Sequence, residues 1–291
     1  IMAEVTIAGV LRAGVYSPNN IGNDTAIFNA VAEYLRKRGF LVNIYSEDQF
    51  MAQEITEPVI LNMCREPKSV EKLQRLEDEG RLVINSGYGI ANGSRERMTR
   101  LLLAAGIPHP ASIIVNTDES VIAAYTKAGF TTGWIKRGDG SAQHKEDVSF
   151  VRNAHDAQSL LQEYFRRGIK RAVINQHLQG DLIKFYGVLG QPFFFWFYPM
   201  EIGHSKYGNE QINGDAHGLE FDHEALRQMC NLAAEELGML IYGGDCIVDT
   251  EGNVKIIDFN DWPSFAPCRD EAAQHIGKCV IDMIKERNLI K

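Results

Sequence analysis

The sequence predicts an α/β unit followed by α+β units, and three observations support this fold class. The first 86 residues alternate apolar strands with helices, as chains that form parallel sheets do. A stretch rich in glycine and proline, Gly106 to Pro110, separates this part from a second series of strands and helices. Near the C-terminus, Asp245, Asp258 and Asn260 lie on two apolar runs separated by turn residues, which indicates a β-hairpin.

The composition limits the class of protein. The chain has 291 residues, of which 45% are hydrophobic and 23% charged, as expected for a globular protein. A net charge of −8 argues against nucleic-acid binding. Five cysteines without a CxxC pair predict neither a disulfide framework nor a zinc site. Because no apolar run has membrane-spanning length and no signal peptide is recognisable, we expect a cytoplasmic protein without a membrane partner; a homodimer is compatible with the sequence.

The first predicted unit, residues 1–86, is an N-terminal domain with a parallel sheet. Its predicted strands and helices alternate: strands over 5–11, 40–45, 58–64 and 81–86, and helices over 24–38 and 68–79. Asp24 or Thr25 is the expected N-cap of the first helix, and Gly39 is its expected stop. The loop 12–23 follows the first strand, where open α/β sheets usually bind ligands, but no GxGxxG pattern indicates a dinucleotide site.

Three further units are predicted after the first. Residues 87–110 form a linker with a helix over 94–105. Residues 111–178 form a small lobe with strands and helices in alternation: strands over 111–115, 133–136 and 171–175, a further strand after 147, and helices over 118–128 and 155–167. Residues 179–291 form a C-terminal lobe with two strands around Gly190 to Pro192, a helix over 222–237 and the hairpin.

The hairpin predicts a cation site. Asp258 and Asn260 are two residues apart, so both project from one face of a strand. If Glu251 and Gly252 are the centre of a tight turn, Asp245 lies opposite Asp258, and the two carboxylates repel each other by about 3 kcal/mol. A divalent cation would offset that repulsion, and hard oxygen ligands favour Mg²⁺ over zinc. The spacing also fits two solvated carboxylates of an ordinary antiparallel pair, and a loop one residue longer would turn Asp245 to the other face.

Two other segments have phosphate-binding and nucleotide-binding character. Lys136 ends a strand and enters the glycine-rich loop that includes Gly138 and Gly140, where backbone N–H groups and a lysine suit a phosphate. A plain hairpin loop explains the same residues, and the spacing of a Walker loop is absent. The strand that ends near Asn175 passes through a turn to Asp181, between two units. This connection offers backbone groups to a flat base, although a linker with a solvated acid explains it too.

Taken together, these motifs resemble the ATP-grasp superfamily in order and spacing. The strongest similarity is D-x₁₂-D-x-N followed by N-x-x-P, from Asp245 to Pro263. This pattern is shared by D-alanyl-D-alanine ligases, ribosomal-protein glutamate ligases and the ATP-grasp inositol polyphosphate kinases. The linker segment from Asn85 to Pro108 is also similar to that of the ligases. The resemblance covers about residues 81–265 and implies an ATP-grasp fold: a pre-ATP-grasp parallel-sheet domain and two lobes that clasp the nucleotide.

The resemblance implies a role for each motif. The residues that would hold ATP are Lys136, Gly138, Gly140 and Ser141 for the phosphates, Asn175, Gln176, His177 and Leu178 for the adenine, and Asp181 for the ribose. Those that would hold one or two Mg²⁺, with Mn²⁺ as a substitute, are Asp245, Asp258 and Asn260. Lys184 would face the substrate and the γ-phosphate. Arg95 or Arg97 stands where many members carry a linker-helix lysine.

The expected reaction is ligation of a carboxylate to an amine, on a small molecule or peptide, through an acyl-phosphate. A small-molecule kinase is the alternative, because Lys184-Phe185-Tyr186 and Asp258 to Pro263 also look like the inositol phosphate kinases. Against the kinase, no dense Lys/Arg cluster suits a polyanion. A nucleotide-binding regulator with decayed catalysis is a third interpretation. It is motivated by Gly243, where peptide ligases often carry an arginine, and by Ser264, where a glycine is usual.

Overall fold

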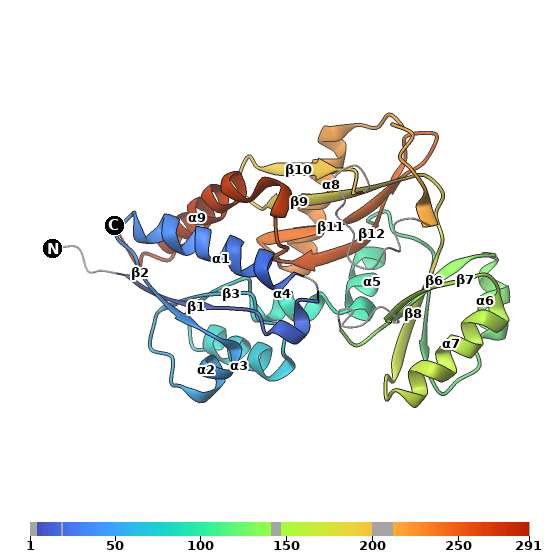
Figure 1. Cartoon of the computed structure of the whole chain (residues 1–291), viewed down its shortest axis with the longest axis horizontal. Coiled ribbons are helices and arrows are strands. Elements are labelled where there is room, and N and C mark those ends of the chain that lie inside the picture. The colour runs from blue at the N-terminus through green and yellow to red at the C-terminus, as the bar shows by residue number, and fades with distance from the viewer. Residues whose placement is uncertain (1–4, 19, 141–146, 200–211, 291) are drawn as a thin grey trace.

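The structure of the protein is a computed structural model that describes residues 5–18, 20–140, 147–199 and 212–290 (Figure 1). Its N-terminal sheet has the order β2-β1-β3-β4 and is parallel throughout, as the sequence predicts. The strands of this sheet are β1 (Thr6–Val10), β2 (Leu41–Tyr45), β3 (Val59–Asn62) and β4 (Leu82–Ile84). The carboxyl ends of β1 and β3 therefore lie side by side, and the loops that follow them meet at one edge of the sheet.

Both faces of the N-terminal sheet are covered by helices. Ile7 and Leu61 pack against α1 (Ile21–Arg36) and α9 (Arg269–Glu286). Their neighbours along the strands, Ala8 and Ile60, pack on the opposite face, which is covered by α2 (Glu47–Ala52) and α3 (Pro67–Asp78). Because successive side chains of a strand point to opposite faces, apolar residues at every strand position seal two cores at once.

The boundaries of two N-terminal helices differ from the prediction. Helix α1 begins at Ile21, so Asp24 lies inside it instead of capping it, and the Asp24 carboxylate accepts from Ser17 and Arg12. Gly39 has a φ of +86° and follows the last turn of the helix, as a stop residue should. Helix α2 was not predicted, although Ser46 and Gln49 form a capping box at its start.

The linker leads into a small antiparallel lobe. Two short helices, α4 (Gly87–Asn92) and α5 (Arg95–Ala104), precede it. The lobe has the strand order β5-β8-β6-β7, and its strands are β5 (Ser112–Asn116), β6 (Gly133–Arg137), β7 (Val148–Val151) and β8 (Arg171–Gln176). Helices α6 (Ile122–Ala128) and α7 (Ala154–Arg166) share one apolar core with this sheet.

The third sheet is antiparallel and carries the predicted hairpin. Its order is β10-β9-β11-β12, with β9 (Asp181–Val188), β10 (Phe194–Phe197), β11 (Ile241–Val248) and β12 (Val254–Asp261). On one face, Phe185 and Phe259 pack in a core shared with α5 and α8 (His223–Leu237). The other face of these strands is therefore the one that presents Asp245, Asp258 and Asn260.

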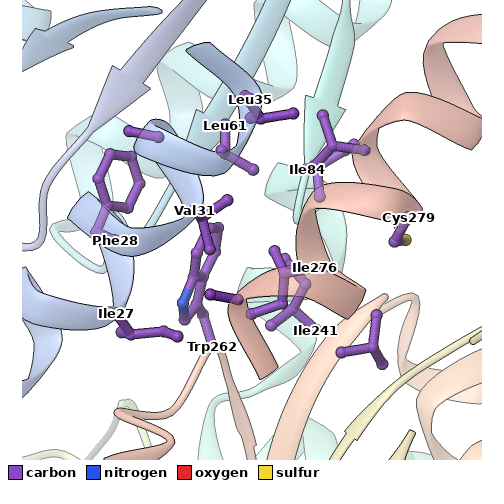
Figure 2. Close-up of a cluster of buried hydrophobic side chains, with 14 of the residues drawn as sticks. Ile27, Phe28, Val31, Leu35, Leu61, Ile84, Ile241, Trp262, Ile276 and Cys279 are labelled. Carbon is purple, nitrogen blue, oxygen red and sulfur yellow. The ribbon is translucent and has the colours of Figure 1, made fainter. Parts of the chain in front are cut away.

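One apolar core joins the third sheet to the N-terminal domain. Trp262, directly after β12, packs among residues of α1 and α9 and lies 5.4 Å from the Phe28 ring (Figure 2). Ile241 of β11 and Ile276 of α9 belong to the same cluster. Helix α9 thus follows the C-terminal lobe in sequence but packs against α1. None of the helices in the described residues is long and apolar enough to span a membrane.

Candidate functional site

The predicted site residues lie in two rows across the third sheet. Lys184 of β9 is the register partner of Asp245 of β11, and Asp245 is the partner of Asp258 of β12. In the next row on the same face, Gly243 lies between Tyr186 and Asn260. The structure therefore brings both predicted carboxylates, the amide and the predicted lysine together, as the spacing indicates.

The pairing of Asp245 with Asp258 depends on a β-bulge that the sequence did not reveal. Nearer the turn, Cys246 pairs with Ile256 and Val248 with Val254, which is one residue out of step with the Asp245 pair. Ile257 has no register partner, and this extra residue in β12 brings Asp245 opposite Asp258. Without it, Asp245 would lie opposite Ile257 and the two carboxylates would not share a row. The turn assumed from the sequence is thus misplaced by one residue, because the Gly252 N–H donates to Asp249 O and centres the turn on Thr250 and Glu251, although the predicted pair is correct.

Cationic side chains lie against the two carboxylates. The Lys184 Nζ is 2.9 Å from Asp245 Oδ1, and Arg95 Nη1 is 2.9 Å from Asp258 Oδ1. The Lys136 Nζ lies 3.5 Å from the backbone oxygen of Ile257, which also accepts from Arg95. The repulsion between the carboxylates is therefore offset by the protein itself, so it does not by itself require a metal ion.

Burial and charge shift the pKa values of two site residues. Burial, together with the charge of Arg95, lowers the pKa of Lys136 to about 7 despite the attraction of Asp258. Burial alone would raise the pKa of Asp258, but the charges of Arg95 and Lys136 outweigh it and hold that pKa well below its ordinary value. Asp258 is thus a carboxylate at any physiological pH, as a metal ligand must be.

The donor set fits a hard divalent cation that keeps other ligands. The side chains of Asp245 and Asp258 remain 21% and 23% exposed, so their oxygens are accessible on that face of the sheet. Within the described parts of the chain, no three or more His, Cys, Asp and Glu side chains gather as a complete metal cage. Two carboxylates and one amide suit Mg²⁺, which usually binds through one or two carboxylates together with water and phosphate oxygens.

The predicted phosphate loop is only partly described. Gly138 bridges two segments: its N–H donates to Arg171 O, and its carbonyl accepts from Glu96 N. A Cβ at Gly138 would lie 3.0 Å from the Arg171 side chain and 3.1 Å from its backbone, so glycine permits this close approach. Among the described residues, none apart from its chain neighbours lies within 4 Å of a Cβ placed on Gly140, and Ser141 lies outside the described residues. Lys136 and Gly138 are thus held near α5, beside Arg95.

The segment predicted to hold adenine and ribose begins later than expected. Asn175 and Gln176 are the last residues of β8, and Asn175 is buried with its Nδ2 bonded to Ser112. His177 and Leu178 follow the strand, and the Trp134 Nε1 lies 3.1 Å from His177 Nδ1. Asp181 is only 2% exposed, and its two oxygens accept from the backbone N–H groups of residues 217 and 219. Asp181 thus anchors the chain before α8, and a bond to ribose would have to share these oxygens.

His109 is a buried histidine that the sequence did not single out. Its Nδ1 lies 2.6 Å from Ile256 O, two residues before Asp258, and its Nε2 is buried without a hydrogen-bond partner. Burial lowers the pKa of His109 to about 4. The imidazole is therefore neutral in the folded protein at neutral pH, with Nδ1 as the donor.

The shifted pKa of His109 makes stability dependent on pH. Between about pH 6.5 and pH 4 the unfolded chain binds a proton at this histidine and the folded chain does not, so acidification in this window destabilises the protein by up to about 3 kcal/mol. Above about pH 6.5 this histidine is neutral in both the folded and the unfolded chain, so its titration no longer changes the stability. We expect His109→Asn to have a lower free energy of unfolding than the wild type at pH 7.5. At pH 5 the gap between the two should be smaller, because the wild type loses stability through protonation of His109 in the unfolded chain and the variant does not. Denaturant titrations at both pH values measure this, and a difference independent of pH would contradict it.

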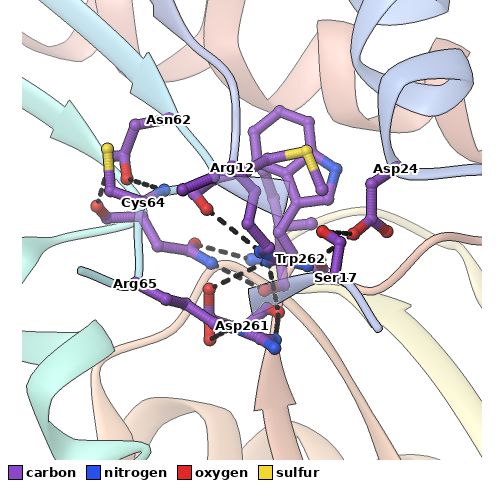
Figure 3. A network of polar contacts seen from close by, with 12 residues as sticks. Arg12, Ser17, Asp24, Asn62, Cys64, Arg65, Asp261 and Trp262 are labelled. Carbon is purple, nitrogen blue, oxygen red and sulfur yellow. Dashed lines mark hydrogen bonds and ion pairs between the residues drawn. The ribbon is translucent and has the colours of Figure 1, made fainter. Parts of the chain in front are cut away.

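Loops of the N-terminal domain meet the segment that follows Asn260. Arg12, after β1, and Arg65, after β3, both bond to Asp261 (Figure 3). Farther along, Arg269 Nη2 donates to Asn23 Oδ1 at 3.0 Å. Arg12, Arg65 and the Asn23–Arg269 pair thus bring loops of the N-terminal domain close to the segment that follows Asn260. The role of Arg12 and Asp261 was not predicted, because only the folded chain brings them together.

The side chains packed around position 243 leave room only for a glycine. A Cβ on this residue would lie 2.7 Å from Pro263 Cγ, 2.9 Å from Tyr186 Cδ1 and 3.1 Å from Phe185 O. Tyr186 and Pro263 therefore occupy the space that an arginine would need. A glycine at this position is thus accounted for by the local packing.

Comparison with known proteins finds similarity in structure alone. No family model and no curated protein matches the sequence. The chain is similar to D-alanyl-alanine synthetase A from Vibrio cholerae, with a TM-score of 0.70, 12% identity, and coverage of 98% of this chain and 100% of that one. For D-alanine–D-alanine ligase from Bacillus anthracis complexed with ATP, the values are 0.65, 15%, 98% and 97%. For a RimK domain ATP-grasp protein from Sphaerobacter thermophilus, they are 0.65, 15%, 96% and 100%. At these identities the similarity establishes the fold.

Proposed function

Because the chain has the ATP-grasp fold, we propose that it is an ATP- and Mg²⁺-dependent ligase that joins a carboxylate to an amine. The observation that carries the proposal is the row of Lys184, Asp245 and Asp258 on one face of the sheet. The Lys184 Nζ lies 2.9 Å from the Asp245 carboxylate, and the Arg95 Nη1 lies 2.9 Å from the Asp258 carboxylate. Paired carboxylates suit a metal ion, and the neighbouring cations suit phosphate oxygens. One surface of the sheet thus offers both kinds of group that a metal–triphosphate complex needs.

The proposed contacts to ATP are those that the motifs of the sequence imply. Lys136 and the loop with Gly138, Gly140 and Ser141 hold the phosphates, and the connection at His177 and Leu178 holds the adenine. Asn175 and Gln176 support that connection from β8, and Asp181 fixes the segment that faces it. Asp245, Asp258 and Asn260 hold one or two Mg²⁺, which, when bound, would draw negative charge from the phosphate oxygens. Mn²⁺ is expected to substitute.

The reaction has two transfers. A carboxylate oxygen of the substrate attacks the γ-phosphorus, the bond to the β-phosphate oxygen breaks, and ADP leaves. The nitrogen of an amine then attacks the acyl carbon, inorganic phosphate leaves with the bonding electron pair, and the amine gives up a proton. Lys184 and Arg95 stabilise the negative charge on the transferring phosphoryl group, which is a charge-stabilising role typical of phosphoryl transfer. Both cations are already fixed by ion pairs to the site carboxylates.

A small-molecule kinase of the same fold is the second candidate, and Gly243 favours it. The side chain that peptide ligases often use to assist the acyl-phosphate step is excluded here by Tyr186 and Pro263. Against a polyanionic acceptor, Arg12 and Arg65, the arginines at the neighbouring loops, are bonded to Asp24 and Asp261. These two arginines and two aspartates together carry no net charge, and no metal ion is proposed beside them to add positive charge for several phosphates. We therefore keep the ligase as the leading proposal.

Product analysis separates these proposals. The protein is incubated with ATP, Mg²⁺ and pools of amino acids, small acids and polyols, and ADP and inorganic phosphate are measured separately. A ligase requires two co-substrates and releases ADP and phosphate in equal amounts. A kinase requires one acceptor and releases ADP without phosphate. ATP binding without turnover in every pool would support the regulator and contradict both enzymes.

A further inference from the structure

We propose that Asp261, held by Arg12 and Arg65, is a positioning residue through which the N-terminal domain sets the geometry of the metal ligands. Asp261 directly follows Asn260 and is the last residue of β12. It touches none of the expected reacting atoms, so its effect passes through Asn260 and Asp258. This inference rests on the proposed metal site, and the experiment below distinguishes failure of the one from failure of the other.

Two arginines form hydrogen bonds with Asp261, at both its side chain and its backbone. Arg65 Nε donates to Asp261 Oδ1 at 3.1 Å, and Arg65 Nη2 donates to the Asp261 carbonyl at 3.0 Å. Arg12 Nη2 lies 3.3 Å from Asp261 Oδ2 and donates to Trp262 O at 3.0 Å. Two planar guanidinium groups therefore fix the direction of the carboxylate and of the peptide next to it.

The two arginines are themselves held by loops and helices of the N-terminal domain. Arg12 Nε donates to Met63 O at 3.1 Å, and Arg12 Nη1 lies 3.2 Å from Asp24 Oδ2 on α1 (Figure 3). The backbone N–H of Arg65 donates to Glu47 at 2.8 Å, and Ala13 donates to the same carboxylate at 3.0 Å. The loops after β1 and β3 are thus cross-linked to each other before they reach Asp261.

Stability alone does not explain this network. Asp261 is 6% exposed and the Arg12 side chain is 3% exposed, so at least two charged groups are removed from water. Replacing such buried ion networks with well-packed apolar residues is often neutral or stabilising, and their best-attested use is to fix one geometry. The two negative partners of Arg12 also make the network unsuited to binding an anionic substrate. The remaining explanation is that the network fixes the direction of the chain directly after Asn260.

The backbone that follows supports the same conclusion. Trp262 has a φ of +26°, a region that side-chain-bearing residues rarely adopt. Its N–H donates to Ile241 O at 3.0 Å, its carbonyl accepts from Arg12, and its ring is buried beside Phe28 of α1. Asn85, after β4, donates to Ile241 O at 2.7 Å and so ties β11 to the same domain. The first residue of β11, Ile241, and the last residue of β12, Asp261, are therefore both bonded to the N-terminal domain, and these are the two strands that carry the proposed metal ligands.

The experiment measures metal binding apart from turnover. Mn²⁺ affinity is determined by titration in the presence of ADP, for the wild type and for Asp261→Asn and Arg65→Lys. We expect both variants to bind Mn²⁺ about 10-fold more weakly, the lower end of the loss that follows removal of a side chain bonded directly to a metal ligand, because Asp261 acts on Asn260 through the backbone. ADP affinity without metal should be unchanged. Hydrogen exchange should increase in residues 258–262 and not throughout the N-terminal domain.

Two controls make the outcome decisive. Glu57→Gln alters another buried acid of the N-terminal domain, which accepts from Asn43 and Tyr45, and it should leave Mn²⁺ affinity unchanged. Asp258→Asn tests the metal site itself. Normal Mn²⁺ affinity in folded Arg65→Lys and Asp261→Asn, with reduced affinity in Asp258→Asn, would overturn the positioning role alone. Normal affinity in Asp258→Asn as well would overturn the proposed metal site.

Discussion

Replacing Asp258 with asparagine is expected to reduce Mg²⁺-dependent ATP turnover by at least about 10³-fold, equivalent to about 4 kcal/mol of transition-state stabilisation. The substitution keeps the size of the side chain but removes a charge that faces Arg95 and Lys136. It leaves these cations without their carboxylate and removes one of the two anionic metal ligands. Steady-state release of ADP at several Mg²⁺ concentrations measures the loss.

The control for Asp258→Asn is the same chemical change at an exposed position. Asp282 on α9 is exposed and accepts from Gln191 at 3.0 Å, so Asp282→Asn should retain wild-type turnover. Circular dichroism and a thermal transition close to that of the wild type would show that Asp258→Asn is folded. If the folded variant turns over ATP at nearly the normal rate, Asp258 is not a metal ligand in the reaction.

The hairpin shows how far local sequence information reaches. The alternation of polar and apolar residues correctly predicted that Asp258 and Asn260 share a face, and Phe259 lies in the core on the other side. The register was predicted from a turn centred on Glu251 and Gly252, whereas the chain turns one residue earlier and corrects the step at Ile257. A bulge changes no composition and leaves only a weak trace in one sequence, so its place could not be read from residue types.

Features that depend on distant segments were not predictable in the same way. Arg12 and Asp261 are 249 positions apart, and nothing in the pattern around either residue indicates the other. The resemblance placed Asp181 at the ribose, but its burial and its bonds to residues 217 and 219 arise only when the chain before α8 folds over β9. The ATP-grasp fold itself was expected from the resemblance to that superfamily, which depends on the order and spacing of local motifs, and the structure has this fold.

Gly244→Ala is expected to destabilise the protein by about 3 kcal/mol, because the added methyl group meets backbone that cannot easily move. The Cβ would lie 2.2 Å from Asp258 O and 2.6 Å from the Phe185 ring. Relief of the first contact requires β12 to move away from β11 at the level where Asp245 faces Asp258. We therefore expect Mn²⁺ affinity in the presence of ADP to fall together with the free energy of unfolding, as measured by denaturant titration.

Gly22→Ala is the matched control for Gly244→Ala, because it adds the same methyl group where, apart from the neighbouring backbone of its own helix, no described residue lies within 4 Å. Gly22 belongs to α1, so alanine should be neutral or stabilising by up to about 1 kcal/mol. If Gly244→Ala is as stable as the wild type but loses Mn²⁺ affinity, the strands separate without cost and only the ligand geometry depends on their contact. If stability falls while Mn²⁺ affinity is retained, the metal does not require the spacing of the two strands, and Asp245 and Asp258 do not bind it together.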